Sequence, residues 1–387
     1  MKNKEHPKLC LYIGSLHKGG AEHVIVNLAD YFFRRGWDVS LVTTYFKLPE
    51  YTMEEGDWDP ETGIVQTNLP GRHVHRIYSD PAPENLNGSR FHNFRVRADT
   101  LRQIWKDEKP DVILSFIGSN NVMSILTTRG LNIPVAISVR ADPAEEYVQA
   151  KTRIPAMLLF SRADLVILQT NGAKAYFPKA VQEKSVILPN SIQPDFIRPR
   201  FAGTRTKRVV MVGRFDENKS QGLVIRAFAD VLKRNETLSS WVLDLYGDGP
   251  ARKDCEDLTK ELSLSDHVLF EGVQEGIAEK IQDAGVFVIA SKREGMPNAL
   301  IEAMSLGLAC ISTDSTPGAP RDLIRNGENG ILVPVDDEKA MADALEDLMT
   351  DPDKCEKLGK EAIRIQESQN PGRVNALWEK ALRSILR

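Results

Sequence analysis

The chain has 387 residues, more than one hydrophobic core usually supports, so we expect two domains of ordinary size. Hydrophobic residues make up 42% and charged residues 27% of the sequence, as in soluble globular proteins. The formal net charge of −4 argues against general nucleic-acid binding, which usually requires a strongly basic domain.

The sequence also predicts a cytoplasmic protein. Residues 1–7 lack the apolar segment of a secretory signal peptide, and no apolar run is long enough to cross a bilayer. The four cysteines lack the close spacing of a zinc knuckle or a redox motif, so we expect reduced thiols.

Short β-branched runs alternate with amphipathic stretches along the chain. The expected strands in the first half are residues 9–13, 39–43, 112–116, 135–139, 165–168 and 186–188. Those in the second half are residues 208–212, 241–246, 268–271, 286–290, 309–313 and 330–333. Helices are expected between them, for example over 21–33, 221–233 and 298–306. This rhythm predicts an α/β protein with two doubly wound parallel sheets.

A segment rich in proline and polar residues, 188–199, separates the two halves. We expect a first domain over 1–195, a linker over 196–204 and a second domain over 205–368. The remaining residues, 369–387, are expected to form a helix that packs back on the first domain.

In the second half, residues suited to ligand binding follow the predicted strands. Gly213, Arg214 and Lys219 follow the first of these strands, Gly247 follows the second, and Gly295 follows the fourth. Glycine lets the backbone approach a ligand closely, and parallel strands end at one edge of a sheet. Turn glycines are common after strands, so the concentration of such loops, rather than any single one, predicts a binding site.

Charged residues in these loops favour an anionic ligand rich in hydroxyl groups. Asn298 is a good N-cap and would place Glu302 in the second turn of a helix, while Glu294 lies in the preceding loop. The free amides at the helix start suit a phosphate, and Arg214 with Lys219 could neutralise a diphosphate without a metal. The alternatives are that Glu302 lies on a solvated helix face and that the cations are merely exposed.

The first half offers weaker signals. Gly19 and Gly20 lead into the first predicted helix and could approach an anion, or they could form an ordinary helix-capping turn. Asp57 and Asp59 have the spacing of an Asp-x-Asp metal motif, but no strong strand precedes them. The seven histidines show no ligand spacing, so we expect no catalytic metal.

The segment Ser89–Lys109 interleaves basic with aromatic and aliphatic side chains. On a helix, Phe94, Leu101, Ile104 and Trp105 share a stripe flanked by cations, which suits an anionic membrane surface or an anionic, lipid-linked acceptor. The alternative is that the stripe packs on the first sheet, as the helix of a βαβ crossover does.

Together these motifs resemble those of the retaining glycosyltransferases of family 4. That family has the GT-B architecture, two facing Rossmann-like domains with a cleft between them. The most specific match is Glu294-Gly-Met-Pro-Asn-Ala-Leu-Ile-Glu302, the family's two glutamates separated by seven residues. Gly19–Glu22, Gly213-Arg214 with Lys219, and Tyr246–Pro250 also match, so the resemblance covers nearly the whole chain.

The resemblance implies roles for individual residues. Arg214 and Lys219 would bind the donor diphosphate and stabilise the departing nucleotide. Glu294 would contact the donor sugar and Glu302 the ribose, while Gly20 would face the diphosphate from the first domain. The remaining donor-binding residues would be Gly19, Gly213, Gly247, Gly295, Met296, Pro297, Asn298, Ala299 and Leu300. Many relatives carry a histidine after the fifth strand; here that role is absent or taken over by Arg140 or Asp142.

The resemblance also implies a reaction. A hexose or N-acetylhexosamine of galactose, N-acetylgalactosamine or glucose type would pass from a UDP-sugar to a saccharide acceptor in cell-surface glycan synthesis. The acceptor would be linked to a polyprenyl diphosphate. Front-face attack would retain the anomeric configuration, without cofactor or metal. Two alternatives stay open: a UDP-sugar 2-epimerase-like isomerase, which needs no acceptor, and a non-catalytic sugar-nucleotide-binding protein.

Overall fold

A computed structural model describes residues 4–17, 19–69 and 71–387. The chain divides into two compact units. Unit 1 comprises Met1–Gln169, Ala173–Leu188 and Asn375–Arg387, and unit 2 comprises Thr170–Gly172 and Pro189–Val374. The division after Leu188 precedes the segment 196–204 that the sequence suggests as the linker.

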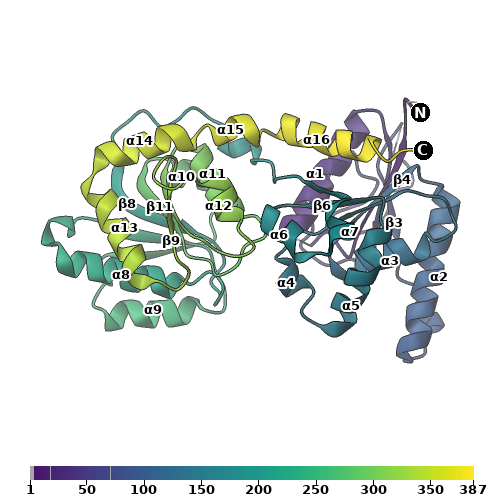
Figure 1. Cartoon of the computed structure of the whole chain (residues 1–387), viewed down its shortest axis with the longest axis horizontal. Helices are drawn as coiled ribbons and strands as arrows, with labels where there is room; N and C mark the ends of the chain where they lie inside the picture. The colour runs from purple at the N-terminus through teal and green to yellow at the C-terminus, as the bar shows by residue number, and fades with distance from the viewer. Residues whose placement is uncertain (1–3, 18, 70) are drawn as a thin grey trace. The chain divides into compact units, whose positions relative to one another are not determined.

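Unit 1 contains a seven-stranded parallel sheet in the order β3-β2-β1-β4-β5-β6-β7. Its strands are β1 Lys8–Ile13, β2 Asp38–Thr43, β3 His75–Tyr78, β4 Val112–Phe116, β5 Val135–Ser138, β6 Leu165–Leu168 and β7 Ser185–Ile187. Its helices are α1 Gly20–Arg34, α2 Arg90–Glu108, α3 Gly118–Thr127, α4 Pro143–Glu146, α5 Ala150–Leu159, α6 Asn171–Tyr176 and α7 Lys179–Gln182. The central strands are buried along their length because helices cover both faces (Figure 1).

Unit 2 contains a six-stranded parallel sheet in the order β10-β9-β8-β11-β12-β13. Its strands are β8 Thr206–Val212, β9 Val242–Tyr246, β10 Val268–Gly272, β11 Ala284–Ile289, β12 Ala309–Thr313 and β13 Ile331–Val333. Its helices are α8 Gln221–Arg234, α9 Arg252–Glu261, α10 Ile277–Ile281, α11 Asn298–Ser305, α12 Ala319–Leu323, α13 Glu338–Thr350, α14 Pro352–Ala362 and α15 Ile365–Ser368. Figure 1 shows α8 and α9 on one side of this sheet and α11 and α12 on the other.

The two sheets confirm the predicted pair of parallel α/β domains. In each, the strand order reverses beside the first strand, β1 in unit 1 and β8 in unit 2. Ligands of such sheets bind at the carboxyl ends of the strands beside this reversal. The loops after β8 and β11 in unit 2, and those after β1 and β4 in unit 1, are therefore the places to search for a site.

The last helix, α16 Pro371–Arg383, runs from unit 2 into unit 1. Within unit 1, the buried ring of Trp378 stacks on Phe116 at a centroid distance of 5.9 Å. Tyr31 donates a hydrogen bond of 2.9 Å to Glu379, and Arg387 pairs with Asp164. These contacts attach the end of the chain to the first sheet.

No helix in the described part of the chain combines the length and the apolar character needed to span a membrane.

Candidate functional site

The loop after β8 is fixed by the loop after β9. The amide of Gly213 donates to the carbonyl of Tyr246, and the amide of Phe215 donates to the carbonyl of Asp248, both at 3.0 Å. Gly247 has a φ of +128°, and a side chain there would collide with the carbonyl oxygen of Gly213. Only glycine permits this approach of two backbones.

Arg214 extends from this loop into solvent, with 71% of its side chain exposed. Its nearest ion-pair partner is Asp216, at 3.9 Å, whereas its backbone carbonyl is held by the side chain of Gln221. The backbone of this residue is thus fixed while its guanidinium group is able to reach a ligand. Guanidinium groups bind phosphate oxygens in a bidentate manner.

Lys219 and Glu294 come together from two different loops. Lys219 Nζ pairs with Glu294 Oε1, which also accepts a 2.7 Å hydrogen bond from the buried Ser291 hydroxyl. The backbone amide of Glu294 donates to the carbonyl of Thr316. A cation and a carboxylate are therefore held next to each other at the carboxyl edge of the sheet.

Asn218 is a residue that sequence reasoning missed. Its side chain accepts from the amide of Arg293 at 3.0 Å and donates to the carbonyl of Arg293 at 2.9 Å. Its own carbonyl accepts from the amide of Lys292. Asn218 thereby joins the loop that carries Lys219 to the loop that carries Glu294. A lone asparagine in a polar loop gives no sequence signal of such a bridge.

The start of α11 differs from the prediction in one respect. Pro297, rather than Asn298, is the N-cap, so the prediction that Asn298 caps this helix was wrong. The helix begins at Asn298, one residue earlier than an Asn298 cap would require, and the side-chain oxygen of Asn298 accepts a 2.6 Å hydrogen bond from Asn190. The backbone amides of Asn298 and Ala299 are the first two of the helix, and amides at this position have no acceptor within the helix.

Other residues of this turn are used by the fold. The amide of Leu300 donates to the carbonyl of Pro297 at 3.0 Å, and the side chains of Leu300 and Met296 lie in the hydrophobic core. Gly295 lies in the bend just before Met296. The amides of Asn298 and Ala299 at the helix start are therefore better placed than that of Leu300 to meet an anion.

Glu302 lies in the second turn of α11 and is partly buried rather than on a solvated face. Within the described part of the chain, its carboxyl group forms no ion pair. Burial raises the pKa of Glu302 to about 8. A carboxyl group kept in this environment suits an interaction with the hydroxyl groups of a ligand.

This shift predicts a pH-dependent effect of Glu302→Gln. The folded pKa of about 8 exceeds the ordinary value of 4.5, so the wild type loses stability as the pH rises between these two values. We expect equal stability of the two proteins near pH 4 and higher stability of the variant at about pH 9. Urea unfolding at a series of pH values measures this; a constant difference in unfolding free energy would contradict it.

In unit 1, Gly19 is the N-cap of α1 and Gly20 its first residue, with open space where a side chain would lie at Gly20. Arg140 lies over the rings of Phe116 and Trp378, at 6.0 and 5.5 Å, and burial lowers its pKa. Asp142 is buried and caps α4 through the amide of Ala144. These contacts give Arg140 and Asp142 roles in the fold of unit 1.

A cavity of about 770 Å³ opens at the carboxyl ends of β1, β2, β3 and β4. Arg90, Asn93, Phe94 and Arg97 of α2 form one wall. The other lining residues come from the strand ends, α3 and α1, with Leu101 further along α2, and they include Ser15, Thr44, Tyr45, Asp80, Ser119, Asn120 and Glu22. Polar and apolar side chains are mixed on the strand side, which includes Ile13 and Ile117, and α2 contributes both aromatic and basic groups.

Helix α2 consists of two different halves. In its second half Leu101 and Trp105 are buried, and Arg102 donates to the carbonyls of Thr127 and Arg129 at the end of α3. In its first half Phe91 is 78% and Phe94 48% exposed. The predicted apolar stripe is therefore divided: Leu101 and Trp105 pack on the sheet, whereas Phe94 remains exposed.

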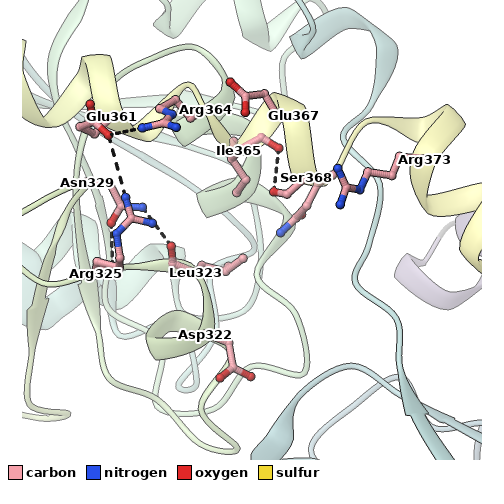
Figure 2. A pocket seen from close by; sticks show the side chains of 11 residues that line it. Asp322, Leu323, Arg325, Asn329, Glu361, Arg364, Ile365, Glu367, Ser368 and Arg373 are labelled. Carbon is pink, nitrogen blue, oxygen red and sulfur yellow. Dashed lines mark hydrogen bonds and ion pairs between the residues drawn. The ribbon is translucent and has the colours of Figure 1, made fainter.

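A further hollow of about 540 Å³ lies in unit 2 between α12, α14 and α15 (Figure 2). Figure 2 shows Arg325 and Arg364 both directed at Glu361, with ion-pair distances of 3.9 and 3.1 Å. None of the residues predicted to bind a ligand lines it. Because none of the predicted ligand-binding residues lines this hollow, we assign it no role in the site.

Among the described residues, one group of side chains could hold a metal ion: Asp57, His73 and His75. It lies in unit 1. Asp59 takes no part, since its carboxylate accepts hydrogen bonds from the amides of Glu61 and Thr62. The two aspartates of the Asp-x-Asp motif therefore do not act together. Asp57 instead lies with two histidines that are distant from it in the sequence.

Two family models match the chain. Residues 18–196 match "Glycosyltransferase Family 4", and residues 193–365 match "Glycosyl transferases group 1". The chain is 28% identical to the Campylobacter jejuni enzyme named GalNAc-alpha-(1→4)-GalNAc-alpha-(1→3)-diNAcBac-PP-undecaprenol alpha-1,4-N-acetyl-D-galactosaminyltransferase, over 89% of each chain. It is 25% identical to N-acetylgalactosamine-N,N'-diacetylbacillosaminyl-diphospho-undecaprenol 4-alpha-N-acetylgalactosaminyltransferase of the same species, over 93% of this chain and 94% of that one.

Solved structures share the fold. Anabaena HepE, determined with UDP and glucose, has a TM-score of 0.78 at 17% identity, covering 98% of this chain and 100% of that one. The sucrose-phosphate synthase of Thermosynechococcus elongatus has a TM-score of 0.76 at 20% identity, covering 98% and 99%. At these identities the similarity concerns the fold alone.

Proposed function

The chain belongs to the glycosyltransferases of the two-domain GT-B fold, and we propose that it transfers an N-acetylhexosamine or hexose from a UDP-sugar to a lipid-linked saccharide. The observation that carries this proposal is that the loops after β8 and β11 pair Lys219 with Glu294 at the carboxyl edge of the second sheet, with Arg214 in the first of these loops and Glu302 in the helix that follows the second. It supplies cations for a diphosphate and carboxyl groups for sugar hydroxyls.

In this proposal the donor lies along the start of α11. Glu302 accepts hydrogen bonds from the ribose, the amides of Asn298 and Ala299 face the phosphates, and Glu294 contacts the transferred sugar. Arg214 and Lys219 stabilise the negative charge that develops on the leaving diphosphate. The leaving phosphate itself takes the proton of the acceptor hydroxyl. The acceptor therefore attacks the anomeric carbon from the same face that the diphosphate leaves, and the anomeric configuration is retained. Two cations fulfil the role that a divalent ion has in other transferases.

The identity of the substrates is proposed from the two C. jejuni relatives. Both are named as N-acetylgalactosaminyltransferases, and both names contain an undecaprenol-diphosphate-linked saccharide. The cavity at the carboxyl ends of β1 to β4 would receive such an acceptor, since Arg90 and Arg97 suit a diphosphate and Phe94 suits a sugar ring or a lipid chain.

The donor proposal is tested by thermal unfolding with a panel of nucleotide sugars in the presence of EDTA. We expect UDP-N-acetylgalactosamine or another UDP-hexose to raise the melting temperature, because a ligand of the folded state stabilises it. Hydrolysis or transfer should continue in EDTA. A shift with GDP- or ADP-sugars only, or a donor shift that requires added magnesium or manganese, would contradict the proposal.

We further propose that the exposed half of α2 meets an anionic membrane surface. Phe91 and Phe94 are exposed beside Arg90 and Arg95, and basic residues near such a surface contribute about 1 kcal/mol each. Arg102 is not available, because it binds the carbonyls that end α3.

The membrane prediction concerns Phe91→Ser combined with Arg90→Gln and Arg95→Gln. We expect this variant to lose most of its co-sedimentation with vesicles that contain anionic lipid at low salt, because both apolar and electrostatic contacts are removed. Lys253→Gln with Lys339→Gln, on exposed helices of unit 2, is the matched control and should bind as the wild type does. Equal binding by the α2 variant and the control would contradict the proposal.

A further inference from the structure

Asp57, His73 and His75 converge at the edge of the first sheet. Strand β3, which begins at His75, is the outermost strand of that sheet. One potential ligand atom from each of the three side chains lies within 4.8 Å of the others. None of these residues belongs to the donor or acceptor groups described above.

The backbone explains why these residues meet. A parallel bridge joins Gly56 to Val74: the amide of Val74 donates to the carbonyl of Glu55, and the amide of Asp57 donates to the carbonyl of Val74. Val74 is fully buried. Side chains alternate along extended backbone, so the two histidines that flank Val74 lie on its opposite face, next to Asp57.

The carboxylate of Asp57 is oriented by the fold. Its Oδ1 accepts a 2.8 Å hydrogen bond from the backbone amide of Arg76, whose guanidinium group forms a fully buried ion pair with Glu50. This leaves Oδ2 on the side of the imidazole rings, 3.7 Å from His73 Nε2 and 3.4 Å from His75 Nδ1. The side chain of Asp57 is 5% exposed, so little water reaches it.

Hydrogen bonding does not account for this arrangement. The 3.7 Å separation is too long for a hydrogen bond, and His73 Nδ1 is buried without a partner among the described residues. Two ligands of a tetrahedral ion with bonds of about 2.0–2.1 Å lie about 3.4 Å apart. The distances from Asp57 Oδ2 to the two histidine nitrogens are thus close to the ligand–ligand separation in such a site.

We propose that Asp57, His73 and His75 bind a zinc ion that fastens the segment before β3 to the edge of the first sheet. Imidazole ligands favour zinc and related transition ions, whereas magnesium and calcium prefer oxygen ligands alone. Three protein ligands leave one position for water. His75 is 53% exposed, which gives the ion a path from solvent. The ion crosslinks chain positions near 57 and 74, and it therefore stabilises the folded protein rather than the transfer chemistry.

The test begins with full-length protein freed of metal by EDTA and dialysis. We expect zinc to bind with one ion per chain by calorimetry and to raise the melting temperature by roughly 5 °C at saturating concentration. Magnesium should give neither effect. Cobalt should bind at the same ratio and give the intense visible absorption of a four-coordinate ion.

Two variants and a control assign the ion to this cluster. His75→Gln changes a half-exposed side chain, and Asp57→Asn keeps Oδ1 for the Arg76 amide while replacing Oδ2. Each should weaken zinc binding about tenfold or more and abolish the thermal shift. His92→Gln, which removes a partly exposed histidine of α2 outside the cluster, should bind zinc as the wild type does.

The metal-free melting temperature of His75→Gln should equal that of the metal-free wild type, so a loss of the zinc response is not a loss of folding. Undiminished zinc binding by both cluster variants would overturn the proposal. So would a wild type that binds no zinc, or one that responds equally to magnesium.

Discussion

Arg214→Ala is expected to lower kcat by roughly a hundredfold or more, because a fixed cation that meets charge developed in the transition state typically contributes that much. The guanidinium group is 71% exposed and its nearest ion-pair partner lies 3.9 Å away, so its removal leaves no buried charge behind. The fold should therefore be unaffected. Steady-state kinetics with the wild type and the variant, together with their melting temperatures, measure both effects.

Arg226→Ala provides the control for Arg214→Ala. Arg226 lies on α8 in the same unit and pairs with Glu338, with 45% and 44% of these side chains exposed. An exposed ion pair of this kind contributes little to stability. We expect wild-type turnover for Arg226→Ala. If Arg214→Ala also turned over at the wild-type rate, Arg214 would have no part in stabilising the leaving group.

Glu294→Gln is expected to reduce kcat more than Glu302→Gln, by roughly a hundredfold against at most severalfold. Glu294 fixes Lys219 through an ion pair and is itself fixed by Ser291, so the substitution would remove the proposed sugar contact and release the cation. In the proposed donor position Glu302 contacts the ribose, and ribose contacts are similar in the ground state and the transition state. Its replacement should therefore appear mainly in KM.

Kinetics of the two glutamate variants over a range of donor concentrations separate these effects. Thermal shifts with UDP alone serve as an independent readout, since UDP carries the ribose but no sugar. Glu302→Gln should weaken the UDP shift, whereas Glu294→Gln should leave it nearly unchanged. A larger fall in kcat for Glu302→Gln would reverse the assignment of the two carboxyl groups.

Most of the architecture could be predicted because parallel strands covered on both faces are continuous apolar runs. Strands such as β4 and β11 are buried at every position, and their sequences show this directly. Strand β3 was missed for the opposite reason. It is a short edge strand that begins with His75 and Arg76, and burial of Arg76 depends on Glu50, which is distant in the sequence.

Site residues could be predicted where one loop contains the whole motif, and less well where contacts between two loops form the site. Glu294 and Glu302 stand out because seven residues separate them at a helix start. Three contacts join segments that are distant in the sequence and could not be predicted from either segment alone. They are the pairing of Lys219 with Glu294, the bridge formed by Asn218, and the binding of Arg102 to the end of α3. The cluster of Asp57 with His73 and His75 likewise depends on the bridge between Gly56 and Val74, which no local pattern indicates.

Product analysis is the most direct test of the proposed reaction. The purified protein would be incubated with a UDP-N-acetylhexosamine and a polyprenyl-diphosphate-linked saccharide, and the new glycosidic bond examined by nuclear magnetic resonance. We expect an acceptor-dependent product whose new linkage has the same anomeric configuration as the donor. A product of inverted configuration, or an epimerised sugar nucleotide formed without acceptor, would contradict the proposed function.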